Sequence, residues 1–218
     1  MAMNSYYNDT LYPLQNKVLK LIDTLETPFY LTGGTALSRC YFNHRYSDDL
    51  DFFVNKNSNF IKYSETLISN LSKDFEVETI IKSESYVSLK VNKILKIDLV
   101  NDVEFRYGDL QEKEIFSKVD NIENILSNKL SAVISRDEAK DVADIWVIAR
   151  DIKIDWKDIF LSANSKAVGI FPPDVAKRLV EFPIELLERI KWVEGKEPEI
   201  KTFQKDLNLI CDSLLATK

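Results

Sequence analysis

The first half of the chain combines two hydrophobic periods. In residues 11–26, apolar side chains recur at helical spacing, which predicts an amphipathic helix that ends at Thr27-Pro28. The apolar stretches that follow are short and alternate with polar positions, as in strands with one buried face. A tight turn is predicted at Asn92-Lys93. The expected strands are 29–32, 48–54, 75–81, 86–91, 94–100 and a short one at 105–110, and the expected helices are 35–41 and 58–72.

From about residue 121 the pattern is helical throughout. Apolar side chains such as Ile122, Ile125 and Leu126 recur every three or four positions, and Pro172-Pro173 is a clear break. The sequence therefore predicts an α+β fold, with a sheet and flanking helices in residues 1–115 and a helical bundle in residues 116–218. The expected helices of the second half are 121–135, 138–150, 155–166, 173–190 with an interruption at Pro183, and 198–215.

Composition supports a folded protein and limits its partners. The 218 residues are 45% hydrophobic and 11% aromatic, which is enough for one large domain or two small ones. The net charge of −6 and the pI near 5.0 argue against a broadly basic nucleic-acid-binding surface, although a local basic patch remains compatible with them.

Cysteine and histidine content argues against a zinc site. Cys40 and Cys211 lie far apart in the sequence, and His44 is the single histidine. The N-terminal sequence does not combine a basic region with an apolar run, and no stretch reaches 18 consecutive apolar residues. We therefore expect a cytoplasmic protein without a membrane partner.

The stretch from residue 30 to residue 54 carries the first candidate chemistry. Asp49 and Asp51 are two positions apart on a predicted strand and should project from the same face. Two adjacent carboxylates repel each other unless a cation lies between them, and an oxygen-only pair suits Mg²⁺ or Mn²⁺. Gly33-Gly34, followed by Thr35 at a predicted helix start, can cradle a phosphate with backbone N–H groups. The simpler alternatives are solvent-facing aspartates and a tight turn with a threonine N-cap.

Asp98 is a third candidate carboxylate. It shares one face of a predicted strand with Lys96, whereas Ile97 and Leu99 share the other. An ordinary exposed strand would look the same. Together with the first pair, however, Asp98 would allow two divalent ions to hold a triphosphate and an attacking oxygen.

The helical half contributes a group of charged candidates. Lys129 and Arg136 are seven residues apart and would lie on roughly one helix face, and Asp141 and Asp144 follow them. From the residues alone, solvated helix charges that pair along the surface are the simpler interpretation. The functional interpretation is that Lys129 and Arg136 bind phosphates or the base, with the two aspartates in support. Arg45 lies in the loop before the acidic strand, where it could contact a phosphate.

Three segments together resemble a known family. They are GGTALSRCYFNHRYSDDLDFFV, IKIDLV and NKLSAVISRDEAKDVADIW, within residues 30–150. The combination resembles the AbiEii/AbiGii toxin-type nucleotidyltransferases of the polymerase-β-like superfamily. This resemblance implies a nucleotidyltransferase-type mixed β-sheet, followed by a helical domain that closes the nucleotide cleft. The superfamily's usual Gly-Ser pair is Gly-Gly followed by Thr35 in this chain.

The resemblance also implies a role for each candidate residue. The residues Gly33, Gly34, Thr35, Arg45, Lys129, Arg136, Asp141 and Asp144 would form the nucleotide site. The residues Asp49, Asp51 and Asp98 would bind Mg²⁺ or Mn²⁺, with two ions expected, and together with Lys129 they would be catalytic. The implied reaction moves NMP from ATP, GTP, CTP or UTP to an acceptor hydroxyl on RNA, tRNA or protein.

Family members are linked to toxin–antitoxin and abortive-infection systems, so the resemblance implies a toxin with a cognate antitoxin. Two other classes stay open at this point. One is a non-catalytic protein that binds a nucleotide or a partner on the same fold. The other is a phosphohydrolase that uses the same metals on water.

Overall fold

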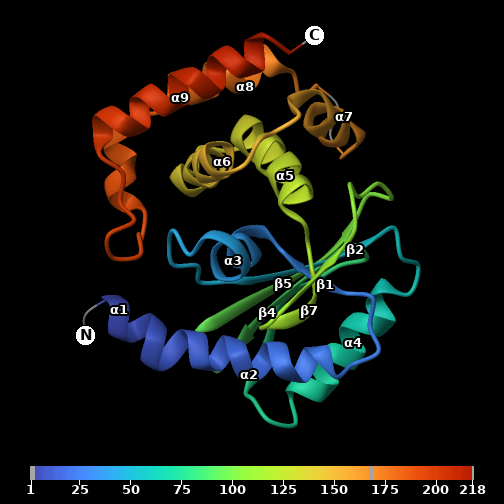
Figure 1. Ribbon diagram of the computed structural model, residues 1–218. Coiled ribbons are helices and arrows are strands. Elements are labelled where there is room, and N and C mark those ends of the chain that lie inside the picture. Colours follow the sequence, from blue (N-terminus) through green and yellow to red (C-terminus); the bar gives the residue numbers. More distant parts are fainter. Residues whose placement is uncertain (1–2, 167–168, 218) are drawn as a thin grey trace. The chain divides into compact units, whose positions relative to one another are not determined.

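A computed structural model describes residues 3–166 and 169–217, and the chain divides into two compact units. The first unit comprises the residues up to Glu104 and the segment Asp109–Asp120. The second comprises Phe105–Gly108 and the residues from Asn121 onward. The domain boundary predicted at 115/116 therefore falls before the last strand of the first unit (Figure 1).

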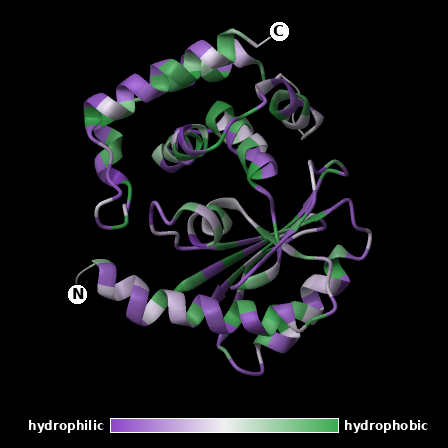
Figure 2. Ribbon diagram, in the orientation of Figure 1, coloured by the Kyte–Doolittle hydropathy of each residue, from purple (hydrophilic) through white to green (hydrophobic). Residues whose placement is uncertain are grey.

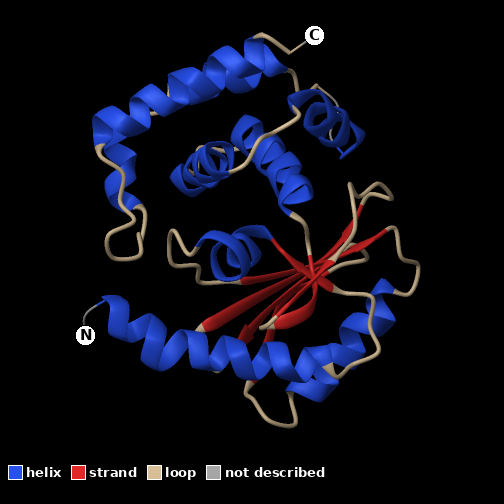
Figure 3. Cartoon of the chain, viewed as in Figure 1, coloured by secondary structure: helices blue, strands red, loops and turns tan. Residues whose placement is uncertain are grey.

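The first unit is built on a mixed sheet in the order β3-β4-β5-β2-β1-β7-β6. The pairs β2–β5 and β1–β7 are parallel, and the other neighbouring pairs are antiparallel. Helices α2 and α4 cover one face of the sheet, and α3 lies on the other (Figures 1 and 3). The elements are α1 Met3–Tyr6, the π-helical turn η1 Tyr7–Leu11, α2 Tyr12–Asp23, β1 Tyr30–Thr32, α3 Gly33–Leu37, the π-helical turn η2 Ser38–Phe42, β2 Leu50–Asn55, α4 Phe60–Leu71, β3 Val77–Lys82, β4 Tyr86–Val91, β5 Leu95–Asp102, β6 Gln111–Lys113 and β7 Phe116–Val119.

The alternation read from the sequence corresponds to the burial of β2. Leu50, Phe52 and Val54 are buried, whereas Asp51 and Phe53 between them are partly exposed. Burying a side chain as large as phenylalanine contributes about 1.5–3 kcal/mol, so the opposite register would cost several such side chains. This burial fixes which face of the strand carries the aspartate.

The turn between β4 and β5 has the predicted form. Asn92 and Lys93 both have positive φ values, 48° and 63°. The N–H of Ile94 donates to the carbonyl of Val91 at 3.1 Å. Two consecutive residues with positive φ are typical of a tight hairpin turn, so the prediction at Asn92-Lys93 is confirmed.

The strand predicted at 105–110 is wrong. Within the described residues this segment is a loop, and the next strand, β6, starts at Gln111. The backbone of Tyr107 is bound by side chains: its N–H donates to Asn124 at 3.1 Å, and its carbonyl accepts from Asn121 at 2.7 Å. Side-chain hydrogen bonds therefore satisfy groups that a strand would pair in a ladder.

The second unit is helical over its described residues, as predicted. Helix α5 starts at an N-cap, where the side chain of Asn121 accepts from the N–H of Asn124 at 2.7 Å. Trp146 lies in the core, with Phe203 at 5.2 Å and Trp192 at 6.2 Å between ring centroids. Polar and apolar residues both occur along α9, as in an amphipathic helix (Figure 2). The elements are α5 Ile122–Ser135, α6 Ala139–Asp151, α7 Trp156–Lys166, α8 Pro172–Val180, the 3-10 turn η3 Ile184–Arg189 and α9 Ile200–Leu215.

The predicted α+β fold is thus confirmed. Among the described residues, none of the helices is both long and apolar enough to cross a membrane.

Candidate functional site

A row of polar residues crosses four strands of the sheet. Thr32 of β1 pairs in register with Asp51 of β2, Asp51 with Asp98 of β5, and Asp98 with Ser88 of β4. Paired residues on neighbouring strands lie side by side on the same face, about 5 Å apart. The structure therefore brings together Asp51 and Asp98, which the sequence placed on separate strands.

Asp98 is held by two donors. The hydroxyl of Ser88 donates to its Oδ1 at 2.7 Å, and the ammonium of Lys96 donates to its Oδ2 at 2.6 Å. Burial opposes the charge on Lys96, but the hydrogen bond and the charge of Asp98, with a contribution from Asp49, raise the pKa of the lysine. Lys96 therefore already places a positive charge beside Asp98. It was not among the site residues predicted from the sequence.

We expect Lys96→Met to tighten the binding of a divalent cation two- to fivefold. The ammonium, with 47% of its side chain exposed, competes with a metal ion for the Asp98 carboxylate. A partly exposed charge of this kind contributes about 0.5–1 kcal/mol. Calorimetric titration with Mn²⁺ measures the effect. Lys56→Met is the matched control, because Lys56 pairs with Glu104 at 2.7 Å and is 71% exposed. Weaker binding in Lys96→Met would contradict the competition.

Asp49 lies immediately before β2, and its backbone is tied to the start of α3. The hydroxyl of Thr35, which is fully buried, donates to the carbonyl of Asp49. Thr35 was predicted to hold phosphate. In this structure its hydroxyl fixes the backbone that carries an acidic residue.

Gly33 lies directly against the acidic row. Its φ is +69°, and a Cβ atom added there would be 2.5 Å from Oδ2 of Asp51. A glycine is therefore required both by the backbone conformation and by the carboxylate. The first peptide of α3 and the Asp51 side chain belong to one site.

We expect Gly33→Ala to lower the free energy of unfolding of the first unit. The left-handed conformation costs about 1–2 kcal/mol for a residue with a Cβ, and the contact with Asp51 adds to this cost. Gly195→Ala is the matched control, since Gly195 has φ +75° and its Cβ would meet nothing within 4 Å. Urea denaturation of both variants separates strain from contact. Equal losses of stability would mean that the contact with Asp51 contributes nothing.

Arg45 packs beneath the glycine turn. Its side chain is buried, its Nη1 donates to the carbonyl of Tyr46 at 3.1 Å, and its carbonyl accepts from the hydroxyl of Ser38. A Cβ on Gly34 would be 2.4 Å from Nη2 of Arg45. Arg45 was predicted to contact the nucleotide. The structure places it against Gly34, where it supports the loop.

The oxygen donors of this site suit a hard divalent cation. Asp49, Asp51 and Asp98 offer carboxylate oxygens only, which are the ligands that Mg²⁺ and Mn²⁺ prefer. Across residues 3–166 and 169–217, no three His, Cys, Asp or Glu side chains are arranged as a ready metal site. The donor chemistry fits the ion. In this structure the Asp98 carboxylate forms a salt bridge with Lys96.

The second unit brings together its four predicted charged residues. Lys129 Nζ lies 2.7 Å from Asp141 and 2.6 Å from Asp144, and Nε of Arg136 lies 2.7 Å from Asp141. Both aspartate side chains are fully buried, and that of Lys129 is 7% exposed. Burial opposes the charge on Asp141, but Lys129 and Arg136 together hold the pKa of this carboxyl below its ordinary value. The simpler interpretation, solvated surface charges, is therefore wrong for Lys129, Asp141 and Asp144.

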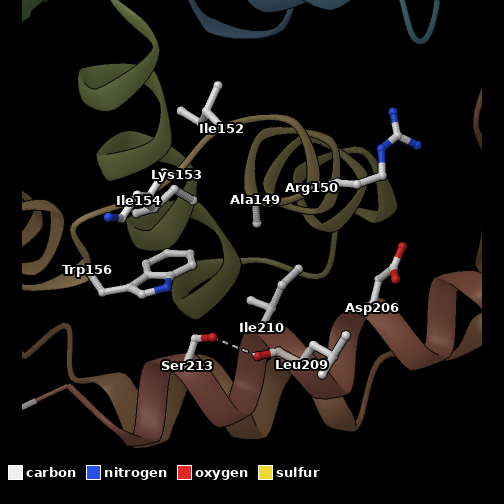
Figure 4. Close-up of a pocket in the computed structure, with 10 residues that line it drawn as sticks. All are labelled: Ala149, Arg150, Ile152, Lys153, Ile154, Trp156, Asp206, Leu209, Ile210 and Ser213. Carbon is white, nitrogen blue, oxygen red and sulfur yellow. Dashed lines mark hydrogen bonds between the residues drawn. The ribbon is translucent and has the colours of Figure 1, made fainter.

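A pocket of about 450 Å³ opens within the second unit, between the end of α6, the start of α7 and α9 (Figure 4). Lys153 and Trp156 lie on one side and Arg150 and Asp206 on the other. Two of its polar groups are already engaged: Asp206 accepts from Trp146 at 2.9 Å, and Arg150 pairs with Asp151 at 2.7 Å. None of the predicted site residues lines this pocket.

Comparison with known proteins gives a consistent set of matches. A family model described as nucleotidyl transferase AbiEii toxin, type IV TA system, matches residues 20–207. An uncharacterized protein from Aquifex aeolicus (strain VF5) is 29% identical over 185 residues, which cover 81% of this chain and 84% of the relative.

Solved structures share the fold at low sequence identity. MenT4, a nucleotidyltransferase toxin from Mycobacterium tuberculosis H37Rv, matches with a TM-score of 0.65 and 13% identity, over 99% of this chain and 86% of its own. JHP933 from Helicobacter pylori matches with a TM-score of 0.54 and 18% identity, over 98% and 93%.

Proposed function

Because the chain belongs to the AbiEii nucleotidyltransferase toxin family, we propose that it transfers NMP from an NTP to an acceptor hydroxyl, with Asp49, Asp51 and Asp98 as its acidic centre. The family resemblance seen in the sequence is confirmed by the match over residues 20–207. The observation that carries the proposal is the register of Asp51 with Asp98, beside the glycine turn at Gly33.

The carboxylates Asp49, Asp51 and Asp98 would hold Mg²⁺ or Mn²⁺. A divalent ion bound there neutralises charge on the triphosphate and on the attacking oxygen. Lys96 would have to release Asp98 before this carboxylate could hold an ion, because the ammonium lies 2.6 Å from Oδ2. The backbone N–H groups of Gly33 and Gly34, at the start of α3, would bind the phosphates.

The reaction is an in-line displacement. The acceptor hydroxyl oxygen bonds to the α-phosphorus, the bond from that phosphorus to the bridging oxygen breaks, and pyrophosphate leaves. Asp98 would take the proton of the hydroxyl, because the family resemblance implies that the third carboxylate lies near the acceptor. We propose RNA, tRNA or a protein as the acceptor, and the cytoplasm as the place of reaction.

Lys129 and Arg136 would contribute charge stabilisation. Arg136 has 51% of its side chain exposed, so a phosphate oxygen could replace one of its hydrogen bonds to Asp141. Lys129 is buried between Asp141 and Asp144, and these carboxylates would orient its ammonium.

The test is incubation with each α-labelled NTP, Mg²⁺ and total cellular RNA or protein. Label retained on a macromolecule, and lost in Asp49→Ala and Asp51→Ala, is the expected result. Release of free labelled NMP without an acceptor would indicate a phosphohydrolase. Nucleotide binding without turnover would indicate a non-catalytic binding protein. Co-expression with the gene that neighbours this one tests whether a cognate antitoxin relieves toxicity.

A further inference from the structure

The segment that leads into β2 is held by side chains from the N-terminal helices. Gln15 of α2 is fully buried, and its Nε2 donates to the carbonyl of Ser47 at 3.2 Å and to that of Asp48 at 3.0 Å. Its Oε1 accepts from Nη1 of Arg39 at 3.0 Å, which fixes the orientation of the amide. One buried side chain thus binds two consecutive carbonyls directly before Asp49.

Two tyrosines complete this attachment. The hydroxyl of Tyr7, in η1, donates to the carboxylate of Asp48, and the N–H of Ser47 donates to the hydroxyl of Tyr12 at 3.3 Å. The ring of Tyr7 is 1% exposed and stacks on Tyr46, with centroids 4.1 Å apart and planes 11° apart. Burial and then Asp48 raise the pKa of Tyr7, so its hydroxyl keeps the proton that it donates.

These contacts act where the sheet does not. Residues 47–49 precede the first residue of β2, so side chains rather than a strand ladder hold their backbone. From the other direction, Thr35 binds the carbonyl of Asp49. Buried polar groups with this many partners are rigid, and a change to a group that orients a metal ligand typically costs about 10- to 100-fold in metal affinity or activity.

We propose that Tyr7, Tyr12 and Gln15 are positioning residues that fix the backbone of residues 47–49 and thereby orient Asp49 and Asp51 for a divalent cation and a nucleotide. The proposal rests on the function proposed above. It gives the N-terminal helices a role in the orientation of the acidic residues. The family match begins at residue 20, so all three residues lie before the matched region. Ser47 and Asp48, to which they bind, lie within it.

The experiment compares Tyr7→Phe/Tyr12→Phe and Gln15→Met with Tyr30→Phe. The tyrosine changes remove hydroxyls and keep the rings. Tyr30→Phe is the matched control, because it removes a hydroxyl that donates to Asn55 at 3.1 Å, at the other end of β2. Three readouts are needed: hydrogen–deuterium exchange of peptides that contain residues 47–50, Mn²⁺ binding by calorimetry, and kcat and KM for transfer.

We expect faster exchange at residues 47–50 in both test variants, and Mn²⁺ binding or kcat reduced about 10- to 100-fold. The control should match the wild type in all three readouts, and all variants should remain folded at the assay temperature. Unchanged exchange and unchanged Mn²⁺ binding in both test variants would overturn the proposal. So would an equal loss in Tyr30→Phe, which would indicate a general effect on the sheet.

The two proposals fail in different ways. If the wild type transfers no nucleotide, the proposed function fails, while exchange and Mn²⁺ binding still decide whether the tyrosines and Gln15 fix the acidic segment. If the wild type transfers nucleotide and the test variants match it in every readout, the function stands and the positioning role is wrong.

Discussion

Asp51→Asn is expected to reduce nucleotide transfer about a thousandfold with little change in folding. Asparagine keeps the shape of the side chain, and the backbone pairing of Asp51 with Thr32 and Asp98 does not depend on its charge. The change removes a negative charge from the centre of the polar row, where a divalent cation would be held. Loss of such a ligand costs several kcal/mol of transition-state stabilisation, and about 4 kcal/mol corresponds to the expected factor.

Asp102→Asn is the matched control for this prediction. Asp102 lies at the last position of β5, the strand that carries Asp98, and the substitution removes the same charge. Its transfer rate should remain within a few-fold of the wild type. In Mn²⁺ titrations, the affinity should fall in Asp51→Asn and stay unchanged in Asp102→Asn. Equal rates in the two variants would mean that Asp51 is not part of the catalytic centre.

Periodicity was a sound guide wherever one side of an element is buried. The alternation in β2 and β5 predicted which positions face the core, because a shift by one residue would expose Phe52 and Ile97. The turn at Asn92-Lys93 was predictable because these two residues separate two strand-like stretches and asparagine accepts a positive φ. The sequence therefore predicted the faces that carry Asp51 and Asp98.

Strand order and the partners of polar groups were beyond the sequence. Nothing in the pattern states that β5 pairs in parallel with β2, and it is this pairing that brings Asp98 to Asp51. Tyr7 and Asp48 are far apart along the chain, and a single tyrosine in a sequence resembles ordinary packing. The contact between Asp120 and Thr32 was likewise not predicted. Asp120 is fully buried and accepts from the hydroxyl of Thr32 at 2.7 Å, but in sequence it resembles a residue at the start of a helix.

The charged residues of α5 and α6 could not be assigned to the interior from their sequence spacing. Lysine and aspartate at helical spacing are most often surface residues, and burial depends on tertiary packing that spacing does not report. In the structure, Asp141 and Asp144 sit one turn apart on α6 and face Lys129 of α5. The resemblance to a family singled out these residues, and the structure shows a buried ion network at that place.

Lys129→Met is expected to lower the free energy of unfolding of the second unit by about 3–5 kcal/mol. The substitution keeps the length of the side chain and removes the ammonium that lies 2.7 Å from Asp141 and 2.6 Å from Asp144. Removing one partner of a buried ion pair leaves an uncompensated charge, which costs far more than the pair itself contributes. Tryptophan fluorescence during urea denaturation reports this unit alone, because Trp146, Trp156 and Trp192 all lie within it.

Lys140→Met is the control, since Lys140 is exposed on α6 and its loss should change stability by less than about 0.5 kcal/mol. Adding Asp144→Asn to Lys129→Met should recover part of the loss, because the second change removes one of the two carboxylates left without the lysine. This recovery separates a buried ion network from simple packing of the lysine stem. Suppose instead that Lys129→Met unfolds like the wild type and still loses nucleotide transfer. Lys129 would then act on the nucleotide only, and its contacts with Asp141 and Asp144 would not support the helical unit.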